Sequence, residues 1–215
     1  MTRNKIISLF LFTILGLIAL QVPFTRLLGS NVKFTLFDFI APTAGAFIGS
    51  LPGVISVLIM QITNLVLHGT NADLGGIIRL FPTLFAVVYF SKKRTINWII
   101  PLLAIVAFNL NPIGRSAWQY SLFWIIPLVA NLFHKNLFAR SLGATFTAHA
   151  VGGAIWVWTF GLTKEIWLGL IPVVAVERLA MASGITLFYF VFSKVLNYAA
   201  KTKLFTIFPL PKKSP

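Results

Sequence analysis

The chain has 215 residues, of which 58% are hydrophobic and only 10% charged, and its mean hydropathy is +0.89. Soluble domains carry about 25% charged residues, so this composition excludes a soluble protein and indicates an integral membrane protein. The lack of cysteine excludes a disulfide framework and a cysteine-ligated metal, and the basic residues behind the net charge of +14 lie between apolar runs, which favours topology signals over a nucleic-acid partner.

Eight apolar runs follow one another along the chain, and they span residues 6–20, 36–50, 53–67, 74–90, 96–110, 117–133, 142–160 and 166–192. Several have about 15–17 residues, fewer than the ~20 that an upright helix needs to cross a bilayer. The second and third runs therefore form either two short spans or one broken, re-entrant hairpin around residues 50–53. We predict an all-α polytopic bundle of six to eight transmembrane helices, with residues 1–215 as a single transmembrane domain.

The positions of Lys and Arg predict the orientation. With eight spans and a cytoplasmic N-terminus, twelve of them lie on the cytoplasmic side and four on the outer side. This asymmetry predicts a multi-pass protein of the cell membrane with both termini inside (N-in/C-in), and residues 201–215 form a short basic cytoplasmic tail. Treating residues 36–67 as one re-entrant unit leaves the later orientation unchanged.

Polar side chains inside the spans gather in their outer halves. A charged group in hydrocarbon costs at least ~2.5–3.5 kcal/mol, so it normally faces a partner, a cavity or a substrate path. We therefore predict an outward-facing pocket for a small solute, and its candidate residues are Asp38, Asn64, His68, Arg79, Asn111, Arg115, Trp118, Tyr120, His149, Trp156, Glu177 and Arg178.

The residue types in this set suggest how a solute would be held. Arg79 and Arg178 would bind an anionic group, whereas Asp38 and Glu177 would bind a cationic or hydrogen-bonding group. The aromatic side chains would stack on a ring, and they are Trp118, Tyr120 and Trp156.

Structural roles compete with this interpretation. Asp38, His68 and Asp73 lie near span ends, where each could be solvated or cap a helix instead of binding a solute. The aromatic residues could form the belt at the membrane interface. Glu177 could form a structural ion pair with Arg79. Because adjacent helical residues point about 100° apart, Glu177 and Arg178 are expected to need at least two partners, one of which could be a ligand.

Small residues recur every four positions in two stripes, at Ala41, Gly45, Gly49 and Gly53 and again at Ala144, Ala148 and Gly152, and Ala180 with Gly184 repeats the spacing in the eighth run. Such stripes let helix backbones approach closely. They predict either a compact bundle or a surface on which a membrane partner docks.

The sequence carries no His-Glu-x-x-His, Gly-x-Ser-x-Gly or P-loop motif. We therefore expect no catalytic residue, metal or cofactor in a transport protein of this kind. The alternative is a membrane-embedded enzyme acting on a lipid or isoprenoid, with His149 and Glu177 as acid and base. A third hypothesis is a structural subunit that assembles through its glycine faces.

The segment FTLFDFIAPTAGAFIGSLPGVI, residues 34–55, is a polar-capped, glycine-rich span followed by a second span that opens with glycine. It resembles the substrate-binding S components of energy-coupling factor (ECF) vitamin transporters. The resemblance implies a small helical membrane protein that binds a vitamin or similar micronutrient from outside. It also implies a transmembrane coupling subunit and two cytoplasmic ATPases as partners, and six helices where the apolar runs number up to eight.

Overall fold

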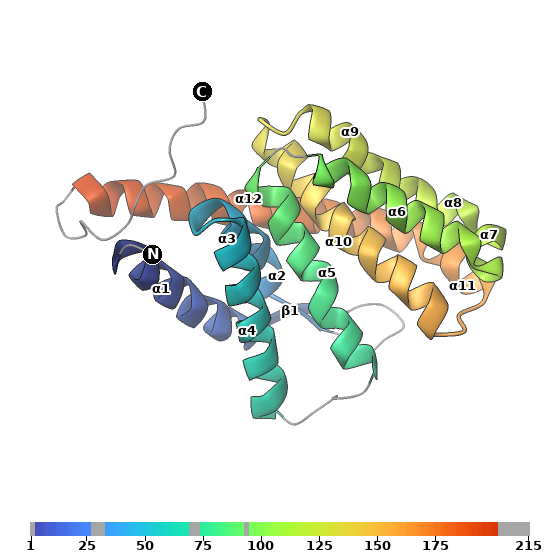
Figure 1. Cartoon of the computed structure of the whole chain (residues 1–215), viewed down its shortest axis with the longest axis horizontal. Helices are drawn as coiled ribbons and strands as arrows, with labels where there is room; N and C mark the ends of the chain where they lie inside the picture. Colours follow the sequence, from blue (N-terminus) through green and yellow to red (C-terminus); the bar gives the residue numbers. More distant parts are fainter. Residues whose placement is uncertain (1–2, 27–32, 69–73, 93–94, 202–215) are drawn as a thin grey trace.

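The computed structural model of the protein describes residues 3–26, 33–68, 74–92 and 95–201 (Figure 1). Most of these residues are helical, which confirms the predicted helical fold class. The exception within the described residues is a two-stranded antiparallel hairpin, β1 (Pro23–Arg26) with β2 (Lys33–Thr35). It follows the first helix, α1 (Arg3–Leu20), and it was not predicted.

The second apolar run is broken into short pieces, α2 (Phe37–Ile40), η1 (Ala41–Thr43) and α3 (Ala44–Phe47). Pro42 lies near the start of η1, and its ring supplies no N–H for a regular helix. The chain then reverses at Gly49, whose φ of 102° lies in a region that residues with a Cβ rarely adopt. Helix α4 (Ser50–His68) packs back against α3, so the predicted break exists and lies at Gly49.

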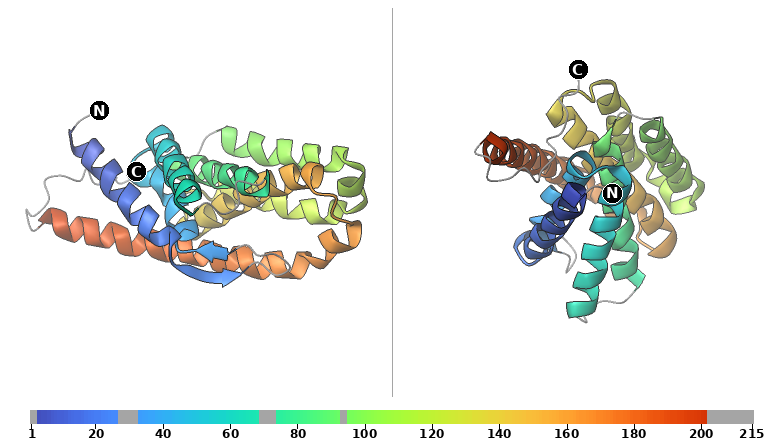
Figure 2. Two further views of the ribbon diagram at one scale, coloured as in Figure 1. Left: turned by 90° about the horizontal axis from the view of Figure 1, so that it is seen from below. Right: turned by 60° about the vertical axis from the view of Figure 1, so that its left-hand side comes forward.

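The rest of the chain forms the larger part of the bundle. Its elements are α5 (Leu74–Ser91), α6 (Ile96–Leu110), α7 (Pro112–Ser116), α8 (Trp118–Ser121), η2 (Leu122–Ile125), α9 (Ile126–Leu132), α10 (Leu137–Thr159), α11 (Lys164–Gly169) and α12 (Ile171–Lys201). The left view of Figure 2 shows α12, in orange to red, extending along the lower edge of the molecule, with α1, in dark blue, above its C-terminal half.

Helix α10 is the centre of the packing, and it contacts α5, α6, α9 and α12. Two of its glycines allow large aromatic residues to approach its backbone. A Cβ at Gly143 would collide with the Tyr89 ring, and a Cβ at Gly153 would lie 2.6 Å from Cζ2 of Trp124. Both aromatic side chains are completely buried, so these contacts belong to the core.

The two small-residue stripes are also used within the chain. Ala41 and Ala144 are completely buried, and a Cβ at Gly45 would collide with the carbonyl oxygen of Val87 on α5. Gly152 packs near Pro82 of the same helix α5. The stripes therefore pack helices of this chain together, and the idea that they form an exposed docking face is wrong.

Three helical segments within the described residues are long and apolar enough to cross a membrane: Ser50–Leu67, Leu74–Ser91 and Ile171–Leu196. Helix α6 is apolar but shorter, with 15 residues. Large apolar side chains such as Leu51, Val66 and Val176 are at least 70% exposed on these helices, which is typical of surfaces that face lipid. The number of spans and their orientation stay predictions.

Candidate functional site

A cavity of about 820 Å³ lies among α2, α4, α5, α10 and α12. This volume is within the usual range for small-molecule sites. Eight of the twelve predicted site residues line it, although they come from distant parts of the sequence: Asp38, Asn64, Arg79, Tyr120, His149, Trp156, Glu177 and Arg178.

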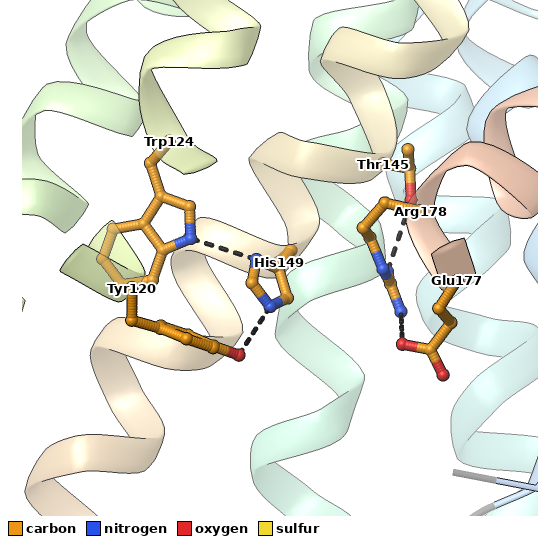
Figure 3. A network of polar contacts seen from close by, with 6 residues as sticks. All are labelled: Tyr120, Trp124, Thr145, His149, Glu177 and Arg178. Atoms are coloured by element: carbon orange, nitrogen blue, oxygen red, sulfur yellow. Dashed lines mark hydrogen bonds and ion pairs between the residues drawn. The ribbon is translucent and has the colours of Figure 1, made fainter. Parts of the chain in front are cut away.

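Glu177 and Arg178 form an ion pair at one wall of this cavity, with 2.9 Å between Oε2 of Glu177 and Nη2 of Arg178 (Figure 3). The predicted pair between Glu177 and Arg79 is therefore wrong. The long arginine stem lets the guanidinium reach back to the preceding residue, which removes the need for two separate partners. Arg79 lies over the ring of Trp156, with its Cζ 5.6 Å from the ring centroid.

Arg178 is held by contacts from several elements, and only 8% of its surface is exposed. Its Nη1 donates to Oγ1 of Thr145 on α10 at 3.3 Å, and its Cζ lies 5.3 Å from the ring centroid of Phe34. A buried guanidinium needs its partners because an uncompensated charge in a low-dielectric interior is costly. Its position is therefore fixed at the cavity wall, where it could meet an anionic group.

Asp38 and Asn64 connect the cavity to the first helix and the hairpin. The carboxylate of Asp38 accepts a hydrogen bond from the backbone N–H of Thr35 at 2.8 Å, which ties β2 to α2. Asn64 accepts from Nε2 of Gln21, which follows α1, at 3.0 Å. Both side chains therefore shape the cavity as well as lining it.

His149 lies one turn along α10 from Thr145, and both of its ring nitrogens make hydrogen bonds (Figure 3). The indole N–H of Trp124 donates to Nδ1 at 3.0 Å, and Nε2 lies 2.8 Å from the hydroxyl of Tyr120. An indole N–H can only donate, so Nδ1 must carry a lone pair and the ring is neutral with its hydrogen on Nε2. This arrangement disfavours His149 as a proton-transfer partner of Glu177.

Sequence reasoning missed Gln61, Trp124 and Trp167. Gln61 and Trp167 line the cavity, whereas Trp124 lies behind His149. Gln61 comes three residues before Asn64 on the same helix face, and this spacing is a signal that could have identified it. Trp167 lies in the six-residue helix α11, where no periodicity separates a site residue from an interfacial one.

Three buried polar atoms of cavity residues have no hydrogen-bond partner in the described part of the protein. They are Oε1 of Gln61, Nε1 of Trp167 and Nε of Arg178. Buried polar atoms are normally paired, because leaving one unpaired costs about 1–3 kcal/mol. These three atoms have almost no accessible surface, so a solute could bond to them only after the side chains had shifted.

The other predicted residues lie elsewhere or cannot be placed. Asn111 caps α7 through Oδ1 and donates from Nδ2 to the carbonyl of Val157 at 3.2 Å, so its role is structural. Arg115 is exposed and donates to the carbonyl of Asn109, and Trp118 is 51% exposed. None of these three lines the cavity. The side chain of His68 lies outside the described residues.

Among the described residues, no group of three or more His, Asp or Glu side chains could hold a metal ion. The two acids and the histidine of the cavity are instead bonded to protein groups: Asp38 to Thr35, Glu177 to Arg178, and His149 to Tyr120 and Trp124.

Comparison with known proteins finds a relative without a described function. The chain is 23% identical over 202 residues to the uncharacterized protein MJ0923 of Methanocaldococcus jannaschii, covering 83% of this chain and 67% of the relative. No family model matches the chain. No solved structure matches it either. The function must therefore be argued from the cavity.

Proposed function

We propose that the protein binds a small amphipathic solute in the cavity and takes part in its uptake across the cell membrane. The observation that carries the proposal is the convergence of charged and aromatic side chains on one cavity within an apolar helical chain. Charges at membrane depth normally mark a substrate path. In the N-in/C-in orientation that we propose, this cavity opens to the outside.

The charges of the cavity favour a particular kind of solute. The two carboxylates of Asp38 and Glu177 balance the two guanidinium groups of Arg79 and Arg178. Because His149 is neutral, the formal charge of the described lining is zero. A zwitterionic or neutral dipolar solute fits such a lining better than a polyanion does. Trp156 offers a ring face beside Arg79, which suits a planar group.

Uptake would need energy from outside this chain. The sequence has no nucleotide-binding motif, and the connections between α5 and α6 and between α9 and α10 are only a few residues long. We propose the arrangement that the resemblance to S components implies, with a transmembrane coupling subunit and cytoplasmic ATPases. The small-residue stripes are internal, so such a subunit would contact a different surface.

The alternative of a lipid-modifying enzyme is less favoured by the geometry. Its acid–base pair would be His149 and Glu177, yet Trp124 donates to Nδ1 of His149 and Arg178 holds Glu177. A general base must present a free lone pair to its substrate. Turnover of a lipid or isoprenoid by the purified protein would nevertheless select this function over uptake.

Equilibrium dialysis of the purified protein against riboflavin, thiamine, biotin, pantothenate and nicotinate tests solute binding. We expect at least one of these vitamins to bind, and Arg79→Gln to weaken that binding about tenfold or more, the size of a lost charge-assisted hydrogen bond. Arg115→Gln is the matched control, because Arg115 is exposed and lies outside the cavity lining. The same vitamin should accumulate in proteoliposomes only when ATPase partners are present.

Three results would contradict the proposal. If none of the five vitamins binds, vitamin-like solutes are excluded. If Arg79→Gln and Arg115→Gln weaken binding equally, the binding site lies outside the cavity. Accumulation driven by a proton or sodium gradient in the isolated protein would identify a secondary transporter and exclude the ATPase partners.

A further inference from the structure

We infer that the Tyr120 hydroxyl donates a hydrogen bond to the solute, and that Trp124 directs this donor through His149 without touching the cavity. The solute would then carry a neutral acceptor, such as a carbonyl oxygen or a ring nitrogen, at the Tyr120 end of the cavity. This inference rests on the proposed function and adds the chemistry of one end of the solute.

The hydrogen bond between His149 and Tyr120 runs from the imidazole to the hydroxyl oxygen. Trp124 Nε1–H lies 3.0 Å from Nδ1 of His149, and an indole nitrogen has no lone pair with which to accept. The hydrogen of the neutral imidazole is therefore on Nε2. It points along the 2.8 Å contact to Tyr120, so the phenolic oxygen accepts this bond.

The hydrogen of the Tyr120 hydroxyl is left for another acceptor. The Tyr120 oxygen accepts from Nε2–H of His149 and still carries its own hydrogen. Among the described residues, the contact with His149 is the one hydrogen bond that this hydroxyl makes. Tyr120 is 3% exposed and lines the cavity. A buried hydroxyl donor normally has an acceptor, and the cavity is where a solute could supply it.

The surroundings of Tyr120 make this end of the cavity suited to an uncharged group. The rings of Phe108 and Trp167 pack on Tyr120 with centroid distances of 6.0 Å and 4.8 Å. A neutral hydroxyl donor among aromatic rings fits the acceptor edge of a planar carbonyl compound or heterocycle.

Trp124 differs from the residues that would touch the solute, because it does not reach the cavity. Trp124 is completely buried and is not part of the cavity lining. Its ring is seated against Gly153 of α10, which brings its N–H to Nδ1 of His149. Trp124 is therefore a positioning residue. Without its N–H, the imidazole hydrogen could move to Nδ1, and Tyr120 would then donate to His149 in place of the solute.

Nitrogen-15 NMR of histidine-labelled protein tests the direction of the network without any solute. The chain has only three histidines, so the His149 signal can be assigned with a His149→Gln variant. We expect the Nε2–H form in the native protein and a population of the Nδ1–H form in Trp124→Phe. An Nδ1–H or doubly protonated ring in the native protein would overturn the inference.

Binding of 1-indanone and of indane tests the acceptor, because these probes share a bicyclic frame and differ by one carbonyl group. We compare the ratio of their affinities in native and variant proteins, so that partition into detergent cancels. The native protein should prefer 1-indanone, and Tyr120→Phe and Trp124→Phe should each reduce this preference about fivefold, as expected for one neutral hydrogen bond. Trp158→Phe is the matched control, since Trp158 is 59% exposed.

The remaining outcomes are decisive as well. A native protein that binds both probes equally, or neither of them, would overturn the inference. The same holds for a preference that Tyr120→Phe leaves unchanged. If any of these results is found while vitamin binding still depends on Arg79, the proposed function stands and the acceptor site at Tyr120 is contradicted. Conversely, an indanone preference without vitamin binding would retain the acceptor site and contradict the proposed solute class.

Discussion

Arg178 illustrates how a cation can be kept inside an apolar helix. Its side chain and that of Glu177 are only 10% and 13% exposed, and the two neutralise each other across 2.9 Å. Thr145 and Phe34 complete the surroundings of the guanidinium. Removing one charge would therefore leave the other buried without compensation.

Arg178→Gln should lower the free energy of unfolding by ~3–5 kcal/mol, because it leaves the Glu177 carboxylate unpaired. The double variant Glu177→Gln/Arg178→Gln should lose clearly less, since no lone charge remains. Unfolding in detergent measured by circular dichroism would show the difference. Losses that simply add in the double variant would mean that the two charges are not coupled.

Gly143 should be intolerant of even one methyl group. In Gly143→Ala the new Cβ meets the ring of Tyr89, which is completely buried and fixed by a 2.7 Å hydrogen bond from its hydroxyl to the carbonyl of Pro127. We expect a loss of ~1–3 kcal/mol, typical of overpacking. Gly169→Ala is the control, because nothing lies within 4 Å of a Cβ there. Equal thermal stability of the two variants would contradict this packing.

At the residue scale, the sequence revealed those side chains whose chemistry is conspicuous in an apolar run. Glu177 and Arg178 stand out by charge alone, and both line the cavity. Their mutual pairing could not be predicted, because it depends on rotamers that the 100° spacing of helical neighbours does not determine. Trp124 was missed because the sequence does not distinguish a tryptophan that only packs in the core from one whose N–H also donates a hydrogen bond to a site residue.

At the scale of elements, the runs at 96–110 and 74–90 correspond closely to α6 and α5. Helix α10 begins five residues before the predicted run at 142–160. The side chain of Asn136 caps it by accepting from the backbone N–H of Ala139. The β1–β2 hairpin could not be predicted, since its short strands lack a clear alternation of apolar and polar residues.

The reversal between α3 and α4 depends on Gly49. A branched residue there would be forced into a positive φ, so Gly49→Val should lower the free energy of unfolding by about 1–2 kcal/mol or more. Gly161→Val is the control, because Gly161 is exposed and nothing lies within 4 Å of a Cβ there. Thermal unfolding of both variants in detergent measures the difference. A Gly49→Val protein as stable as the control would show that the turn adopts another conformation.

The orientation of the whole molecule can be tested at the two ends of α10. Lys135 precedes this 23-residue helix and Lys164 follows it, and both are exposed. At 1.5 Å per residue the helix is about 34 Å long, enough to separate the two sides of a bilayer. In intact cells an impermeant thiol reagent should label a cysteine at Lys164 and spare one at Lys135, and the cysteine-free background gives no other signal. The opposite labelling pattern would turn the cavity toward the cytoplasm.

The apolar part of α12 is longer than the hydrocarbon layer of a bilayer is thick. Its apolar segment Ile171–Leu196 has 26 residues, or about 39 Å of helix, whereas the hydrocarbon layer is about 30 Å thick. To bury this segment fully, α12 must incline by about 40°, and lipids with longer acyl chains would let it stand more upright. Glu177 and Arg178 lie in the first third of this segment and line the cavity, so we expect a change in the tilt of α12 to shift this ion pair relative to the other cavity residues.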